Sequence, residues 1–222
     1  MRHGSLPLPS RLYLLARDAG RPAVTDAVPP QRLVRAGALA ELARRGLLVD
    51  DDGTVTPLDL DSRTGDAVLD GLLDLVRESL PHGWRTWVRL RARITADAVR
   101  EQLVAEGWMR AEKRRVLGVF PSVDHVLARP ALVRALREET RGALCGPVPV
   151  AEVPTRDAAV AALAGAARLR GLTTGCERPR DAERIEALAG RGGTAPGAGR
   201  IMRALCAAVT AHATGTVAAA AG

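Results

Sequence analysis

The feature that most constrains the fold is the helical spacing of apolar residues between positions 64 and 80. Leu69, Leu72, Leu73, Val76 and Leu80 recur at steps of three and four residues, which places them on one face of an α-helix. Acidic side chains occupy the opposite face, and Thr64-Gly65-Asp66 supplies a helix start. The segment predicts an amphipathic helix that must bury its apolar face against other helices.

Comparable patterns along the chain predict a mainly α-helical fold. Further helices are expected at residues 6–18, 30–45, 84–88, 95–107, 130–142, 155–169, 181–188 and 199–214. Pro29-Pro30 opens the second of these, and Thr95 is expected to cap the helix that ends at Gly107. We predict a single domain over residues 1–222, built from a central group of amphipathic helices.

Two small β-hairpins are expected beside these helices. The first covers residues 47–58, with Asp50-Asp51-Asp52-Gly53 as its turn. The second covers residues 115–126, with Pro121-Ser122-Val123-Asp124 as its turn.

The cysteines and the absence of targeting signals predict a cytoplasmic protein. Cys145, Cys176 and Cys206 lie far apart and form no CxxC pair, which fits three small buried hydrophobes in a reducing compartment. The chain has no signal peptide pattern and no run of about 20 strongly apolar residues.

The charge distribution predicts an anionic partner. The net charge is +7, and Lys113 is the only lysine among 32 basic residues. Residues 81–120 hold nine basic and four acidic residues, whereas residues 50–70 hold seven acids and only Arg63 as a base. Such a chain presents a positive face to a membrane surface or to nucleic acid.

The usual catalytic and metal-binding patterns are absent from the sequence. It contains no GxSxG, no HExxH and no glycine-rich loop ending in GK[ST]. The four histidines are scattered without ligand spacing, so we expect no metal, no cofactor and no catalytic residues. The sequence therefore predicts a binding protein and not an enzyme.

Arginines at unusual positions are the candidate binding residues. Arg35 falls on the stripe of its predicted helix that should face the core, where it must either pair with an internal carboxylate or bind an anion. Arg85, Arg89 and Arg93 follow at four-residue spacing, which predicts a basic ridge along one helix edge. The ridge is either a solvated face or a phosphate-binding surface.

Four stretches of the sequence resemble the Golgi phosphoprotein 3 family. They are the leucine-rich opening Leu6 to Asp18, Leu33-Val34-Arg35 through Glu41 to Leu48, Thr64 to Asp70, and Leu103 to Met109 leading into Glu112 to Leu117. Their order and spacing agree from about residue 6 to residue 217. The resemblance implies a largely α-helical domain with a protruding β-hairpin.

The resemblance also implies a function, since members of this family bind phosphatidylinositol 4-phosphate and attach peripherally to membranes. It carries a lipid-headgroup role to Arg35 and Arg93. The family's other pocket arginine falls near Ala96 and its tryptophan near Asp26, so the pocket is incomplete, and Arg91 or Arg89 is the expected substitute. An adaptor role in trafficking or enzyme retention on the cytoplasmic face of a membrane follows, with protein clients.

The second hairpin corresponds by the same resemblance to an element linked to membrane contact and oligomer formation. Its apolar residues are Leu117, Val119 and Phe120. A homo-oligomer is therefore expected.

The main alternative is a nucleic-acid-binding module. A helix at residues 95–107 followed by the basic segment 110–120 is similar to the helix and wing of a winged-helix domain. The preceding helices lack exposed base-reading side chains, which favours the membrane over nucleic acid.

Overall fold

The computed structural model describes residues 6–18, 28–116, 120–169, 171–173, 179–191, 193 and 197–211. The helices are α1 (Leu8–Asp18), α2 (Pro30–Arg44), α3 (Ala67–Glu78), α4 (Trp84–Arg89), α5 (Ala92–Ala105), α6 (Pro130–Cys145), α7 (Thr155–Ala166), α8 (Pro179–Gly190) and α9 (Ala198–Thr210). The strands are β1 (Leu48–Asp51), β2 (Thr54–Pro57), β3 (Met109–Val116) and β4 (Phe120–Leu127). The fold is mainly α with two small antiparallel hairpins, as predicted.

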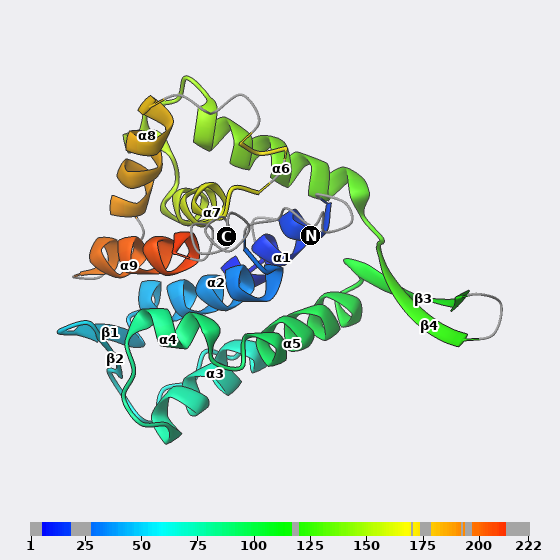
Figure 1. Ribbon diagram of the computed structural model, residues 1–222, viewed down its shortest axis with the longest axis horizontal. Coiled ribbons are helices and arrows are strands. Elements are labelled where there is room, and N and C mark those ends of the chain that lie inside the picture. The colour runs from blue at the N-terminus through cyan, green and yellow to red at the C-terminus, as the bar shows by residue number, and fades with distance from the viewer. Residues whose placement is uncertain are drawn as a thin grey trace, which may run out of the picture.

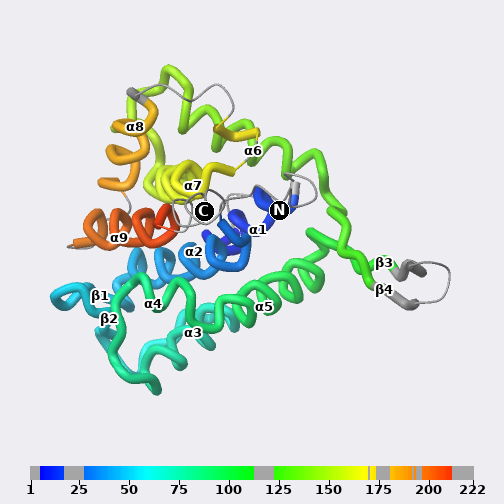
Figure 2. Tube along the Cα trace, in the orientation of Figure 1, coloured from blue at the N-terminus to red at the C-terminus, as the bar shows by residue number. Residues whose placement is uncertain are grey.

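Helix α2 forms the centre of the molecule. It packs against α1, α4, α5, α7 and α9, and it lies between α3–α5 on one side and α6–α9 on the other (Figure 1). Every residue from Leu33 to Ala43 is buried, because small residues such as Gly37 let neighbouring helices approach its backbone. The rest of the chain wraps around this buried stretch, which is apolar apart from Arg35 and Glu41 (Figure 2).

The ends of the first helices follow local sequence signals. Pro30 opens α2 directly after its N-cap residue Pro29. The side chain of Asp66 caps α3 by accepting hydrogen bonds from the backbone N–H groups of Val68 and Leu69, both at 3.0 Å. These observations confirm the predicted starts of both helices.

The break between α4 and α5 differs from the prediction. Helix α5 begins at Ala92, and Thr95 is buried inside it, so Thr95 is not the cap. The N-cap residue is Arg91, which adopts the left-handed conformation with φ 49° and ψ 29°. The break separates Arg85 and Arg89 on α4 from Arg93 on α5, so the three arginines do not form one continuous helical ridge.

The first hairpin forms where the sequence predicts it, but its turn is shorter, because Asp50 and Asp51 of the predicted turn are paired residues of β1. Strands β1 and β2 pair from Leu48 with Pro57 to Asp51 with Thr54. The two turn residues, Asp52 and Gly53, have positive φ angles of 45° and 86°, as the favoured two-residue hairpin turns require.

The second hairpin is longer than predicted and turns at a different place. Strand β3 starts at Met109, and β4 pairs with it from Phe120 opposite Val116 to Leu127 opposite Met109. Pro121 to Asp124 therefore lie within a strand, so their predicted role as the turn was wrong. A two-stranded ribbon leaves one edge of each strand free, which lets a proline near the strand start be accommodated. The hairpin projects from the helical body (Figure 1).

The cysteines do not all behave as predicted. Cys145 is disulfide-bonded, so the prediction of three unpaired thiols was wrong for this residue. Cys206 is free, and burial raises the pKa of its thiol to about 12. Cys176 lies outside the described residues.

Candidate anion-binding site

Helix α4 is held against the body by its two tryptophans. The Trp84 indole Nε1 donates a hydrogen bond to Asp50 Oδ1 at 2.6 Å, and Arg200 Nε of α9 lies 3.4 Å from Asp50 Oδ2. Trp87 and Val88 are fully buried in the core that α4 shares with α2 and α9. The remaining face of α4 is turned to solvent, and it carries Arg85, Thr86 and Arg89.

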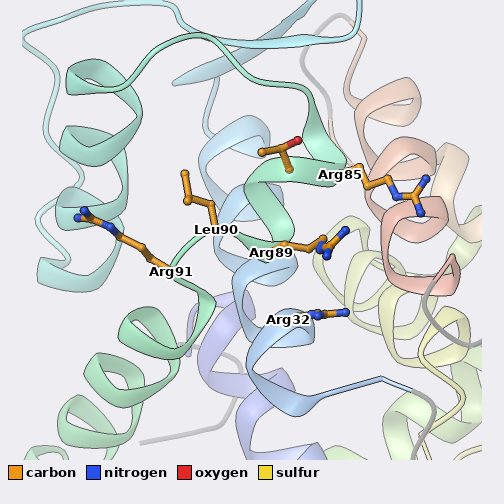
Figure 3. A pocket seen from close by; sticks show the side chains of 6 residues that line it. Arg32, Arg85, Arg89, Leu90 and Arg91 are labelled. Atoms are coloured by element: carbon orange, nitrogen blue, oxygen red, sulfur yellow. The ribbon is translucent and has the colours of Figure 1, made fainter. Parts of the chain in front are cut away.

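A hollow of about 470 Å³ opens between this face of α4 and the first turn of α2. Its lining residues are Arg32, Arg85, Thr86, Arg89, Leu90 and Arg91. The side chains of Arg32, Arg85 and Arg89 extend to the same side, whereas Arg91 extends away from them beyond Leu90 (Figure 3). We call this feature the arginine hollow.

The arginine hollow carries uncompensated positive charge. Among the residues that the structure describes, its lining contains no carboxylate. Within the described parts of the chain, none of its four arginines forms an ion pair. Burial, and then the charge of Arg89, lower the pKa of Arg32 below its ordinary value. Like charges held this close repel one another, and a bound anion would relieve the repulsion.

Arg35 lies beneath the hollow, one turn further along α2 than Arg32. Its side chain is 1% exposed, and its Nη2 donates a hydrogen bond of 2.7 Å to the backbone carbonyl of Leu90. The Nε and Nη1 atoms are buried without a hydrogen-bond partner. Burial, and then the charge of Arg91, lower the pKa of Arg35 to about 10. Arg35 therefore holds the α4–α5 junction by one hydrogen bond and pairs with no carboxylate of the described residues.

The junction that Arg35 holds is a strained point of the backbone. Arg91 is one of three non-glycine residues with positive φ among those that the structure describes. The left-handed conformation costs an ordinary residue roughly 1–2 kcal/mol. The hydrogen bond from Arg35 to Leu90 fixes the carbonyl next to this residue, so the directions of Arg89 and Arg91 depend on the buried cation.

Arg93 lies in a second, smaller hollow. This hollow measures about 320 Å³ and is lined by Tyr13, Pro30, Gln31, Arg93, Ala96, Asp97 and Arg100. Arg93 Nε lies 3.7 Å from Asp97 Oδ2, and Arg100 Nη1 lies 2.6 Å from Asp97 Oδ1. Asp97 therefore offsets part of the positive charge there.

The structure thus groups the predicted lipid-binding arginines in two places. Arg89 and Arg91 line the arginine hollow above Arg35, whereas Arg93 lines the neighbouring hollow beside Asp97. Sequence reasoning missed Arg32. The available signal was its position three residues before Arg35, which puts both on the same side of α2.

The predicted hairpin residues are only partly described. Leu117 and Val119 lie outside the described residues, and Phe120, the first residue of β4, pairs with Val116. At the base of the hairpin, Arg17 Nη2 of α1 donates to Asp124 Oδ1 at 2.8 Å and to the carbonyl of His125 at 2.7 Å. These bonds tie the ribbon to the helical body.

The described residues form neither a metal-ligand cluster nor a membrane-spanning helix. No three His, Cys, Asp or Glu side chains of that part of the chain gather as metal ligands would. None of its helices combines the length and the apolar character needed to cross a bilayer.

Comparison with known proteins places the chain in a family. A comparison with curated proteins gave no significant match. The family model described as Golgi phosphoprotein 3 (GPP34) matches residues 8–212 and so spans α1 to α9, including both hollows. The chain belongs to the Golgi phosphoprotein 3 (GPP34) family.

Proposed function

We propose that this protein is a peripheral membrane-binding protein that recognises the phosphate of an anionic phospholipid headgroup in the arginine hollow. A headgroup of the phosphatidylinositol 4-phosphate kind fits the proposal. The role of the protein is binding and not catalysis. The protein acts as an adaptor for trafficking or for enzyme retention on the cytoplasmic face of a membrane. A homo-oligomer and protein clients belong to the same proposal.

The observation that carries the proposal is the grouping of Arg32, Arg85 and Arg89 around one open hollow, whose described lining residues include no carboxylate. Guanidinium groups match phosphate oxygens in geometry, and charge-assisted hydrogen bonds to phosphate are roughly twice as strong as neutral ones. A hollow lined by three converging guanidinium groups can contact several oxygens of one phosphate. Membership of the family supports the same reading.

The arginines of the hollow supply only a modest binding free energy. A basic residue near an anionic bilayer contributes about 1 kcal/mol, so three arginines provide about 3 kcal/mol. That is weaker than a millimolar association, which corresponds to about 4 kcal/mol. Stable attachment therefore needs a specific headgroup, an apolar contact with the bilayer, or several copies acting together.

Vesicle sedimentation tests the proposal with one double variant and a matched control. Arg85→Ala with Arg89→Ala removes two exposed arginines of the hollow and should weaken binding to vesicles containing phosphatidylinositol 4-phosphate by roughly thirtyfold, from about 1 kcal/mol per residue. Arg134→Ala removes an exposed arginine of α6 that has no ion pair among the described residues, and it should bind as the wild type does.

Vesicle binding and duplex DNA binding together separate the alternatives. Wild-type protein should prefer acidic vesicles to vesicles of phosphatidylcholine alone, and the preference should weaken with salt. An equal loss of binding free energy per arginine removed in the double variant and in Arg134→Ala would show that overall charge, and not the hollow, attracts the membrane. Tight, salt-dependent binding to duplex DNA without a vesicle preference would replace the proposal by the nucleic-acid-binding alternative.

A further inference from the structure

Ile94 is an exposed apolar side chain beside the arginine hollow. It is 62% exposed and stands in the first turn of α5. Its backbone N–H donates to the carbonyl of Arg91 at 3.0 Å, which places it one turn from a residue that lines the hollow. Arg93, whose side chain is 88% exposed, precedes it directly.

The fold does not use Ile94 in its core. Helix α5 buries Ala92, Thr95, Val99 and Leu103, which follow one face of the helix. Ile94 lies on the opposite, outward face at this spacing. An isoleucine here gives up the stabilisation that burial provides, so its apolar surface is free for an external contact.

The charges around Ile94 distinguish it from other exposed apolar residues. Leu58 and Leu60 are 66% and 68% exposed, but they alternate with Asp59 and Asp61. Ile94 instead follows Arg91 and Arg93. Asp97, one turn further on, offsets part of the charge of Arg93, whereas Arg91 lines a hollow whose described residues include no carboxylate. An apolar tip inside a cationic surface complements the anionic surface and apolar interior of a bilayer.

We infer that the first turn of α5 enters the headgroup region of an anionic membrane, with Ile94 as its apolar tip and Arg91 and Arg93 on its flanks. The long arginine stems let their cationic ends reach phosphates while the isoleucine sits deeper. This inference rests on the proposed function, and it fixes which face of the molecule lies against the bilayer.

A tryptophan placed at position 94 tests the inference directly, as a change in emission relative to the wild type. The three natural tryptophans, Trp84, Trp87 and Trp108, are 4%, 0% and 1% exposed, so a new tryptophan at position 94 would be the one indole on this surface of the described chain. Ile94→Trp should shift its emission to the blue when vesicles containing phosphatidylinositol 4-phosphate are added. Lipids with brominated acyl chains should quench it. Leu80→Trp, at a position that is 78% exposed and two residues after Glu78, should show neither change.

An affinity measurement gives the second test. Ile94→Ala should weaken vesicle binding by roughly five- to tenfold, from the apolar area that it withdraws. It should leave binding of soluble inositol bisphosphate unchanged, because that probe has no apolar phase to enter.

The outcomes distinguish this inference from the proposed function. If wild-type protein binds acidic vesicles but Ile94→Trp keeps its spectrum and Ile94→Ala its affinity, the inference is overturned and the lipid-binding proposal stands. If Ile94→Ala also lowers the affinity for soluble inositol bisphosphate, the Ile94 side chain supports the hollow and does not enter the bilayer. If wild-type protein binds no vesicles, both are overturned.

Discussion

Replacing Arg35 by methionine tests whether a buried cation is kept at the expense of stability. The fall of its pKa from 12.5 to about 10 means that burial, together with the charge of Arg91, disfavours the charged guanidinium by about 3 kcal/mol. Because the folded-state pKa is the lower one, the whole of this cost is present at neutral pH. It is relieved only as the pH rises from about 10 toward the unfolded value.

The expected effect of Arg35→Met is the difference of two terms. The variant removes the cost of the buried charge and keeps an apolar stem of similar length. It also removes the hydrogen bond to the Leu90 carbonyl, a loss of about 1–3 kcal/mol. The free energy of unfolding at pH 7, measured in urea, should therefore stay unchanged or rise by up to about 2 kcal/mol. Affinity for acidic vesicles should fall.

Glu41 on the same helix provides the contrast. Its side chain is 0% exposed, and it accepts hydrogen bonds from Arg44 at 2.7 Å and Arg45 at 2.9 Å. Burial alone would raise the pKa of Glu41, but these arginines hold it below its ordinary value. Glu41→Met should lower the free energy of unfolding by about 2–4 kcal/mol, since it leaves several partly buried guanidinium groups without their carboxylate partner. A loss of that size in Arg35→Met would refute the reasoning, because it would mean that Arg35 has a stabilising partner.

Two further predictions concern the backbone. Gly37→Ala should lower the free energy of unfolding by about 1–3 kcal/mol, because its Cβ would lie 2.5 Å from Leu12 Cδ1 and 3.2 Å from Pro9 Cα. The matched change Gly71→Ala, with no atom within 4 Å, should gain up to about 1 kcal/mol in the same urea titration, and equal effects would contradict the close approach of α1 to α2. Arg91→Gly should raise the melting temperature, since glycine relieves about 1 kcal/mol of strain at φ 49°. A lower melting temperature would show that the arginine side chain stabilises the junction.

Local signals in the sequence predicted much of the fold. The cap at Asp66, the proline pair before α2 and the turn at Asp52-Gly53 each act on residues a few positions away. A pattern within a short window is sufficient for such signals. Where two local signals compete, the prediction was less successful, as at Pro121, which reads as a turn but lies in β4.

The α4–α5 junction could not be read in this way. Arginine is not a residue type that favours the left-handed conformation, so the sequence does not predict an N-cap at Arg91. Threonine is a preferred N-cap residue, so the sequence predicted that the helix begins at Thr95. The hydrogen bond that holds the junction comes from Arg35, 55 residues away from Leu90. The two ends of that contact meet only when α2 and α4 have packed.

The sequence by itself determined that this chain is a mainly helical, arginine-rich protein with a positive region between residues 81 and 120. Only the tertiary structure decided which arginines lie together, since it placed Arg32 beside Arg85 and Arg89 and separated Arg93 from them. The physical reason is that helix formation depends on neighbours within about four residues. Charge repulsion and desolvation depend instead on distance and burial, which packing sets between distant parts of the chain.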